Sequence, residues 1–122
     1  MKKILVVDDE KPIREMLKKF LTKKGYEVYD ADNGEDAVKI VKESVPYIVL
    51  LDIRMPKSDG IEVLKKIKEV NKDIGVIMIT AVSETAIAEK CMELGAFDYI
   101  TKPISLEYLE ECLLAKLLDF YK

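Results

Sequence analysis

The sequence contains no histidine, and it has two cysteines, Cys91 and Cys112, both inside segments with helical periodicity. Without histidine there is no imidazole for general acid–base catalysis or for a mixed zinc site. The two cysteines do not have the close spacing of a metal-binding pair, so we expect both to be reduced, partly buried thiols. Zinc binding and histidine-based catalysis are therefore disfavoured.

Long apolar runs and blocks of like charge are also missing. The longest apolar stretches are far shorter than the roughly 20 residues that a membrane helix needs, and the first residues resemble a strand rather than a signal peptide. The 20 basic and 23 acidic residues are scattered, with a net charge of −3 and no basic arm for nucleic acid. We therefore expect a cytoplasmic protein that contacts neither membrane nor nucleic acid directly.

What the sequence does contain is a strict alternation of strand-like and helix-like segments. Short apolar, β-branched runs predict strands at about 3–8, 26–31, 48–52, 75–80 and 98–101. Apolar residues at helical spacing predict helices at about 11–24, 34–44, 61–71, 84–94 and 106–120. This alternation predicts an α/β fold with an open five-stranded parallel sheet in the order 2-1-3-4-5 and five helices on both faces, which is the doubly wound, flavodoxin-like arrangement. At 122 residues the chain has room for one domain.

Side chains that could bind a ligand or take part in a reaction occur at the ends of four of the predicted strands. In chain order they are Asp8 and Asp9, Asp52, Thr80 and Lys102. In an open parallel sheet the carboxyl ends share one edge, ligands bind there, and the 2-1-3-4-5 order makes the first and third strands neighbours. We therefore expect the three aspartates to lie together, with the hydroxyl and the ammonium group nearby.

Three converging carboxylates repel one another unless a cation neutralises them. Mg²⁺, with Mn²⁺ as an alternative, suits such a site because it prefers octahedral oxygen ligands and keeps several waters. The predicted metal ligands are Asp8, Asp9, Asp52 and the backbone carbonyl of Arg54. The alternative is that Asp8, Asp9 and Glu10 only cap the following helix, but capping does not require a partner acid on the third strand.

A carboxylate beside a divalent cation, with a lysine and a hydroxyl at neighbouring strand ends, is suited to accept a phosphoryl group. Asp52 would be the nucleophile, Lys102 would neutralise a phosphoryl oxygen, and Thr80 would donate a hydrogen bond to another. Taken one at a time, Thr80 fits an ordinary strand threonine and Lys102 fits a solvated charge before a turn. The predicted phosphoryl site rests on their occurring together, at the ends of successive strands. Pro103 follows Lys102, and the sequence leaves the isomer of that peptide bond open.

Four motifs carry a family resemblance and together extend over essentially the whole chain. They are LVVDDE at 5–10, LLDIRMP at 50–56 with DG at 59–60, ITA at 79–81, and GAFDYITKP at 95–103. With these motifs the chain resembles a response-regulator receiver domain of two-component signalling, similar in form to the stand-alone chemotaxis response regulators. The resemblance implies that residues 1–122 form a receiver domain, with no effector domain in this chain.

The resemblance implies a phosphorylation-activated switch that assists only its own phosphorylation and dephosphorylation, and not an enzyme with a separate substrate. Asp52 would accept the phosphoryl group from a histidine kinase or a phosphotransfer protein, with Mg²⁺ bound to the acidic cluster. Thr80 and Tyr99 would be the switch pair. They would reshape the fourth helix, the fifth strand and the fifth helix, a surface that would bind a downstream effector or form a homodimer.

The last predicted helix carries more apolar surface than one core stripe needs. One stripe consists of Leu106, Leu109, Leu113, Leu117 and Phe120, and a second row about 100° away consists of Leu114, Leu118 and Tyr121. The second row predicts a contact with an effector or a second copy of the chain. Scattered surface leucines, or a surface that docks on an absent domain, are the alternatives.

Three other interpretations fit parts of the pattern. A Mg²⁺-dependent phosphohydrolase of the haloacid dehalogenase type expects a second aspartate two residues after the nucleophile, where this chain has Arg54. A flavodoxin-like flavin carrier shares the topology, but Asp8, Asp9 and Glu10 would repel the FMN phosphate. The segment also fits the receiver module of a longer DNA-binding regulator.

Overall fold

A five-stranded parallel sheet forms the centre of the computed structural model, which describes residues 2–120, with the backbone alone for residues 117, 119 and 120. Its strands are β1 (Lys3–Val7), β2 (Glu27–Ala31), β3 (Ile48–Leu51), β6 (Gly75–Thr80) and β7 (Asp98–Thr101). Their order across the sheet is β2-β1-β3-β6-β7. Counted along the chain, this is the predicted order 2-1-3-4-5, which is confirmed.

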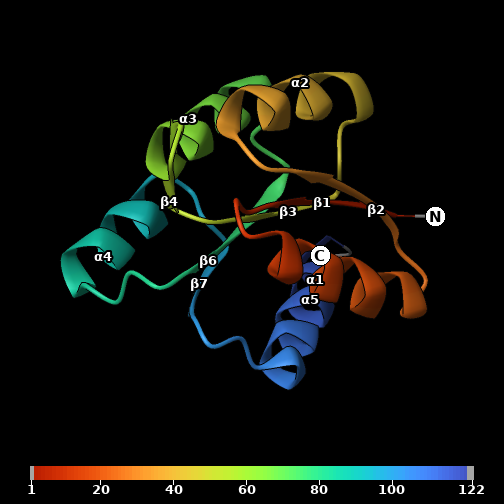
Figure 1. The fold of residues 1–122 in the computed structure, drawn as a ribbon. Coiled ribbons are helices and arrows are strands. Elements are labelled where there is room, and N and C mark those ends of the chain that lie inside the picture. Colours follow the sequence, from red (N-terminus) through yellow and green to blue (C-terminus); the bar gives the residue numbers. More distant parts are fainter. Residues whose placement is uncertain (1, 121–122) are drawn as a thin grey trace.

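Five helices cover the two faces of this sheet. They are α1 (Lys11–Lys23), α2 (Gly34–Ser44), α3 (Gly60–Val70), α4 (Thr85–Glu93) and α5 (Leu106–Phe120). Helices α1 and α5 lie on one face, and α2 and α3 lie on the other, with α4 beside α3 (Figure 1). The predicted fold class is therefore confirmed, and the boundaries of all ten predicted elements agree with the structure to within one residue.

Each face of the sheet has its own hydrophobic cluster. Along β1, Ile4 and Val6 pack with α1 and α5, whereas Leu5 and Val7 pack with the helices of the other face. All four side chains are at most 1% exposed. Neighbouring side chains on a strand point to opposite faces, so a strand covered on both faces is apolar throughout. Each of these buried side chains contributes about 1.5–3 kcal/mol, which holds the strand ends in fixed positions.

The segment between β3 and α3 contains a small antiparallel hairpin that the sequence did not predict. Its strands are β4 (Arg54–Met55) and β5 (Ser58–Asp59), with Arg54 opposite Asp59 and Met55 opposite Ser58. Strands of two residues are too short to show a periodic pattern, so the segment was expected to be a loop. The hairpin places Arg54 directly beside the end of β3.

The outward row expected on α5 is exposed where its side chains are described. Leu114 is 52% and Leu118 is 68% exposed, whereas Leu109 and Leu113 are buried. The two predicted apolar rows also include Leu117, Phe120 and Tyr121, but these side chains lie outside the described part of the structure. Within residues 2–120, no helix has both the length and the apolar character needed to cross a membrane.

Helix α4 is held by few side chains. Within the described structure, Cys91 is the one buried residue that α4 contributes. Gly95 follows the helix with a φ of +103°, the left-handed conformation expected of a residue just past a helix end. Both cysteines are buried and free, in agreement with the expectation of reduced thiols.

Candidate functional site

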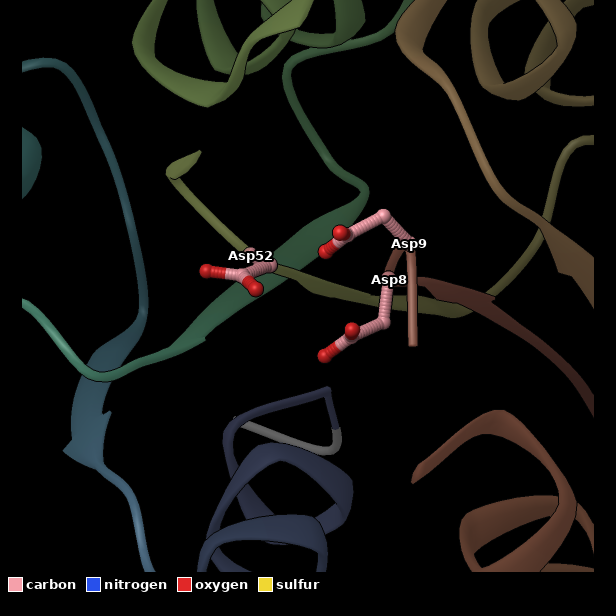
Figure 2. A group of neighbouring side chains, drawn as sticks. All are labelled: Asp8, Asp9 and Asp52. Carbon is pink, nitrogen blue, oxygen red and sulfur yellow. The ribbon is translucent and has the colours of Figure 1, made fainter. Parts of the chain in front are cut away.

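Three aspartate side chains meet at the carboxyl ends of β1 and β3 (Figure 2). Asp8 and Asp9 follow β1, and Asp52 follows β3, its hydrogen-bonded parallel neighbour. Each contributes one carboxylate oxygen to a group in which all the oxygens lie within 4.8 Å of one another. Asp8 and Asp52 are 3% and 5% exposed, whereas Asp9 is exposed, so the cluster has a buried floor and an open side. The sheet order thus brings together the three acids that the sequence selected.

Lys102 lies between the two buried carboxylates. Its Nζ is 2.9 Å from Oδ2 of Asp8, 3.1 Å from Oδ2 of Asp52 and 3.8 Å from Oε2 of Glu10. The residue follows β7, which β6 separates from β3, so the side chain reaches past the end of β6 to the acids. The peptide bond to Pro103 is cis. The structure therefore places a positive charge inside the acidic cluster.

Burial and ion pairing act in opposite directions on these groups. Burial raises the pKa of Asp8, while the N–H of Glu10 and the ammonium group of Lys102 oppose this rise. Burial alone would lower the pKa of Lys102, but its hydrogen bonds with Asp8 and Asp52 and the negative charges of these residues together outweigh burial and raise it. Repulsion by Asp52 is the smallest cause acting on Asp8. Loss of solvent, more than repulsion between acids, is therefore the main cost of ionising Asp8 here.

Two contacts fix Asp8 itself. Its Oδ1 accepts a hydrogen bond from the N–H of Glu10 at 2.9 Å, and its backbone carbonyl accepts one from Arg14 Nη1 at 2.8 Å. Arg14 also contacts Asp30 of β2 at 3.2 Å, which holds the guanidinium in place. Within the described chain, the side chain of Glu10, the N-cap residue of α1, makes no capping hydrogen bond. This does not favour the interpretation that the acidic run serves only to cap the helix.

The donor set fits a hard divalent cation. Three carboxylates offer oxygen ligands, and Asp9 leaves the cluster open to solvent. The backbone of Arg54 lies beside them, because its N–H is 3.4 Å from Oδ1 of Asp52. Oxygen ligands with three negative charges suit Mg²⁺ or Mn²⁺ better than softer metals. The ammonium group of Lys102 among the same oxygens shows that the site accommodates positive charge.

Thr80 and Tyr99 are connected through the segment that joins β6 to α4. The hydroxyl of Thr80, which is fully buried, accepts a hydrogen bond from the N–H of Val82 at 3.3 Å. The hydroxyl of Tyr99 donates to the carbonyl of Val82 at 2.6 Å. Burial raises the pKa of Tyr99 further above neutral pH, in keeping with a phenol that donates a hydrogen bond to the Val82 carbonyl. Within the described chain, Thr80 makes no hydrogen bond with Asp52, so the structure places these two side chains near the same edge without joining them.

The side chain of Arg54 reaches the start of α4. Its guanidinium lies 3.9 Å from Glu84, the N-cap residue of α4, and both side chains are largely exposed. A haloacid dehalogenase site would have a carboxylate at this position. The structure therefore offers no second acid of the kind that the phosphohydrolase interpretation requires.

Sequence reasoning missed three contributors to the site: Glu10 as a third acid near Lys102, Arg14 as a support for Asp8, and Val82 as the link between Thr80 and Tyr99. Glu10 stands in the acidic run itself and could have been included. Arg14 donates from its side chain to the backbone carbonyl of Asp8, and Val82 bonds to Thr80 and Tyr99 through its own backbone. A backbone partner atom is present at every position, so the sequence did not indicate these two contacts.

Known proteins share this architecture. Residues 4–114 match the family model of the response regulator receiver domain. A two-component response regulator from Clostridium difficile is 29% identical, with 100% of both chains covered and a TM-score of 0.95. The chemotaxis protein CheY4 from Vibrio cholerae is 28% identical over 94% of this chain and 98% of that chain, with a TM-score of 0.88.

The same fold also occurs within a longer protein. NtrX from Brucella abortus is 30% identical with a TM-score of 0.86, and the match covers 98% of this chain but 29% of that chain. The family model matches most of the present chain, and the sheet has the order that the alternation of strands and helices predicted. This chain belongs to the response regulator receiver domain family.

Proposed function

We propose that this receiver domain is a phosphorylation-activated switch in which Asp52 accepts a phosphoryl group from a histidine kinase or a phosphotransfer protein. The observation that carries the proposal is the position of Lys102, 3.1 Å from the buried carboxylate of Asp52 and 2.9 Å from that of Asp8. Asp52 follows β3, the central strand, whose neighbours are β1, which Asp8 and Asp9 follow, and β6, which ends in Thr80. It is therefore the aspartate that lies between the acids that would hold a cation and the strand that ends in Thr80.

The transfer exchanges one bond to phosphorus for another. An oxygen of Asp52 forms a bond to phosphorus while the bond between phosphorus and the imidazole nitrogen of the phosphohistidine breaks. The imidazole keeps the electron pair and takes up a proton. The product is an acyl phosphate on Asp52, and the protein acts only on itself, as a switch rather than as an enzyme with a separate substrate.

Mg²⁺ held by Asp8, Asp9, Asp52 and the backbone carbonyl of Arg54 would supply positive charge to the phosphoryl oxygens. Asp8 is fixed for this role by the N–H of Glu10 and by Arg14. The exposed Asp9 keeps the binding site accessible from solvent.

Lys102 and Thr80 would stabilise the phosphoryl group once it is attached. Lys102 exchanges its ion pair with Asp52 for one with a phosphoryl oxygen, a change that needs little movement because the two groups already touch. The hydroxyl of Thr80 accepts a bond from Val82 N–H and keeps its own proton to donate to another phosphoryl oxygen. Both roles depend on positioned charge rather than on proton transfer.

A movement of Thr80 would reach Tyr99 because both are bonded to Val82. Tyr99 lines a shallow pocket of about 520 Å³ between α4 and β7, together with Ala88 and Met92. Few side chains hold α4, so its position responds readily to such a change. The proposed output is an altered surface of α4, β7 and α5 that binds an effector or a second copy of the chain.

Intact-mass spectrometry tests the proposal. Incubation with acetyl phosphate and Mg²⁺ should add one phosphoryl group to the wild type and none to the Asp52→Asn variant, and EDTA should prevent labelling of the wild type. The matched control is Asp59→Asn, because Asp59 lies in the same segment but caps α3 through the N–H of Ile61; this variant should label normally. Labelling of Asp52→Asn at the wild-type level would contradict the assignment.

A further inference from the structure

The hairpin that carries Arg54 is attached to a helix that contributes no residue to the acidic cluster. The hydroxyl oxygen of Ser58, in β5, accepts a hydrogen bond from the N–H of Gly34 at 2.7 Å. Gly34 is the first residue of α2. Its N–H has no partner inside the helix, because the first four N–H groups of any helix lack one. The Ser58 hydroxyl supplies that partner and connects α2 to the hairpin.

The contact between α2 and the hairpin depends on glycine at position 34. A Cβ on Gly34 would lie 2.5 Å from Cγ2 of Val63 and 3.0 Å from Oγ of Ser58. Neither distance is compatible with an undisturbed side chain at this position. The start of α2 therefore lies so close to the hairpin and α3 that a side chain at position 34 would force Val63 or Ser58 to shift.

The two ends of the hairpin segment are held in different ways. At its base, the N–H of Gly60 donates to the carbonyl of Ile53 at 2.8 Å, and the Cα of Gly60 packs against the backbone of Asp52. At its far end, Ser58 pairs with Met55, and Met55 directly follows Arg54. Ser58 is therefore linked across the hairpin to the neighbour of Arg54, whereas the base is held by contacts that do not involve Ser58.

We propose that Ser58 is a positioning residue for the divalent cation, because its bond to Gly34 holds the hairpin that carries the backbone carbonyl of Arg54 beside the aspartates. This inference rests on the proposed function, in which that carbonyl is a metal ligand. Ser58 is uncharged, so its removal leaves the charge of the site unchanged and affects the cation through geometry alone. Binding is reciprocal, and a bound cation must therefore strengthen the bond between Ser58 and Gly34.

A Mg²⁺ titration followed by amide chemical shifts tests the effect of Ser58 on affinity. The Kd for Mg²⁺ should rise about threefold to tenfold in Ser58→Ala, the loss expected for one hydrogen bond, and Ser58→Thr should restore most of the affinity because it keeps the hydroxyl. The matched control is Ser105→Ala, which removes a similar bond, from Tyr108 N–H to the Ser105 hydroxyl at 3.2 Å, at the start of α5. That variant should bind Mg²⁺ as the wild type does.

Hydrogen exchange in the wild-type protein gives a second test that requires no mutation. Mg²⁺ should slow exchange of the Gly34 amide more than exchange of the Tyr108 amide, which also bonds to a serine hydroxyl. Equal slowing of both amides, or a Ser58→Ala variant that binds Mg²⁺ as tightly as the wild type, would contradict the role of Ser58 but would leave the proposed function standing. A wild-type protein that does not bind Mg²⁺ would overturn the proposed function and this inference together.

Discussion

Replacing Lys102 with alanine should destabilise the metal-free protein far more than the loss of an ordinary surface lysine. The ammonium group contacts Asp8 at 2.9 Å and Asp52 at 3.1 Å, and the side chains of these three residues are only 15%, 4% and 6% exposed. Without Lys102, two buried carboxylates remain with no positive charge between them. Ionised carboxylates in such surroundings are costly because they lose solvation and gain nothing in return.

The expected size of the effect follows from this burial. Removing one partner of a buried ion pair typically costs about 3–5 kcal/mol, and we expect about 3 kcal/mol here because the cluster is open to solvent on the side of Asp9. That is a large part of the roughly 5–15 kcal/mol that stabilises a domain, and it corresponds to a fall in Tm of about 10 °C. Saturating Mg²⁺ should recover most of the loss, because it supplies the missing positive charge.

Urea unfolding followed by far-ultraviolet circular dichroism, in EDTA and in saturating Mg²⁺, measures both quantities. The matched control is Lys24→Ala, since Lys24 lies 2.9 Å from Glu110 but both side chains are 42% exposed. This exposed pair should contribute less than about 1 kcal/mol, and its loss should not depend on Mg²⁺. Equal losses in the two variants, or an equal gain from Mg²⁺ in the wild type and in Lys102→Ala, would refute the reasoning.

Three further predictions concern charge and surface. Burial and the hydrogen bond to Asp98 raise the pKa of Cys112 from 9.0 to about 12. As the pH rises, the thiol therefore loses its proton in the unfolded protein before it does so in the folded protein, and the free energy of unfolding falls through that interval. Asp98→Asn should flatten this fall in urea midpoints, and a fall of unchanged size would contradict the cause. Asp9→Asn should raise metal-free stability by less than about 1 kcal/mol, because Asp9 is exposed, and should reduce the rise in Tm that Mg²⁺ produces; an undiminished rise would remove Asp9 from the ligand set. Replacing Leu114 and Leu118 together with glutamate should abolish any tightening of self-association or target binding that beryllofluoride produces in sedimentation experiments, and an unchanged gain would assign these leucines to ordinary surface.

Apolar periodicity was sufficient to predict the sheet and its helices. In a strand buried on both faces, every residue is apolar and none alternates with a polar one. Such strands, for example β3 with its four consecutive buried residues, are recognisable as continuous apolar runs. The strict alternation with helices then leaves few topologies. Hairpin β4–β5 escaped prediction because strands of two residues show no periodic pattern, and because one bond that holds it, from Gly34 to Ser58, joins residues distant in sequence.

The sequence was sufficient to select the residues of the site, but not to predict all the contacts between them. The strand ends selected Asp8, Asp9, Asp52, Thr80 and Lys102 because each follows or ends a recognisable strand. Sequence reasoning assigned Lys102 to the phosphoryl group and did not foresee that its ammonium group already bridges two carboxylates. That contact depends on how far a side chain from one edge of the sheet reaches across its neighbour, which only the three-dimensional arrangement determines.

Chemical identification of the phosphorylated residue tests the central claim most directly. Borohydride reduces an acyl phosphate to an alcohol, so phosphorylated protein treated in this way should carry homoserine in place of the modified aspartate. Peptide sequencing by mass spectrometry should find homoserine at Asp52, at the end of β3, and at none of the other aspartates. Homoserine at Asp8 or Asp9 with an unmodified Asp52 would contradict the account.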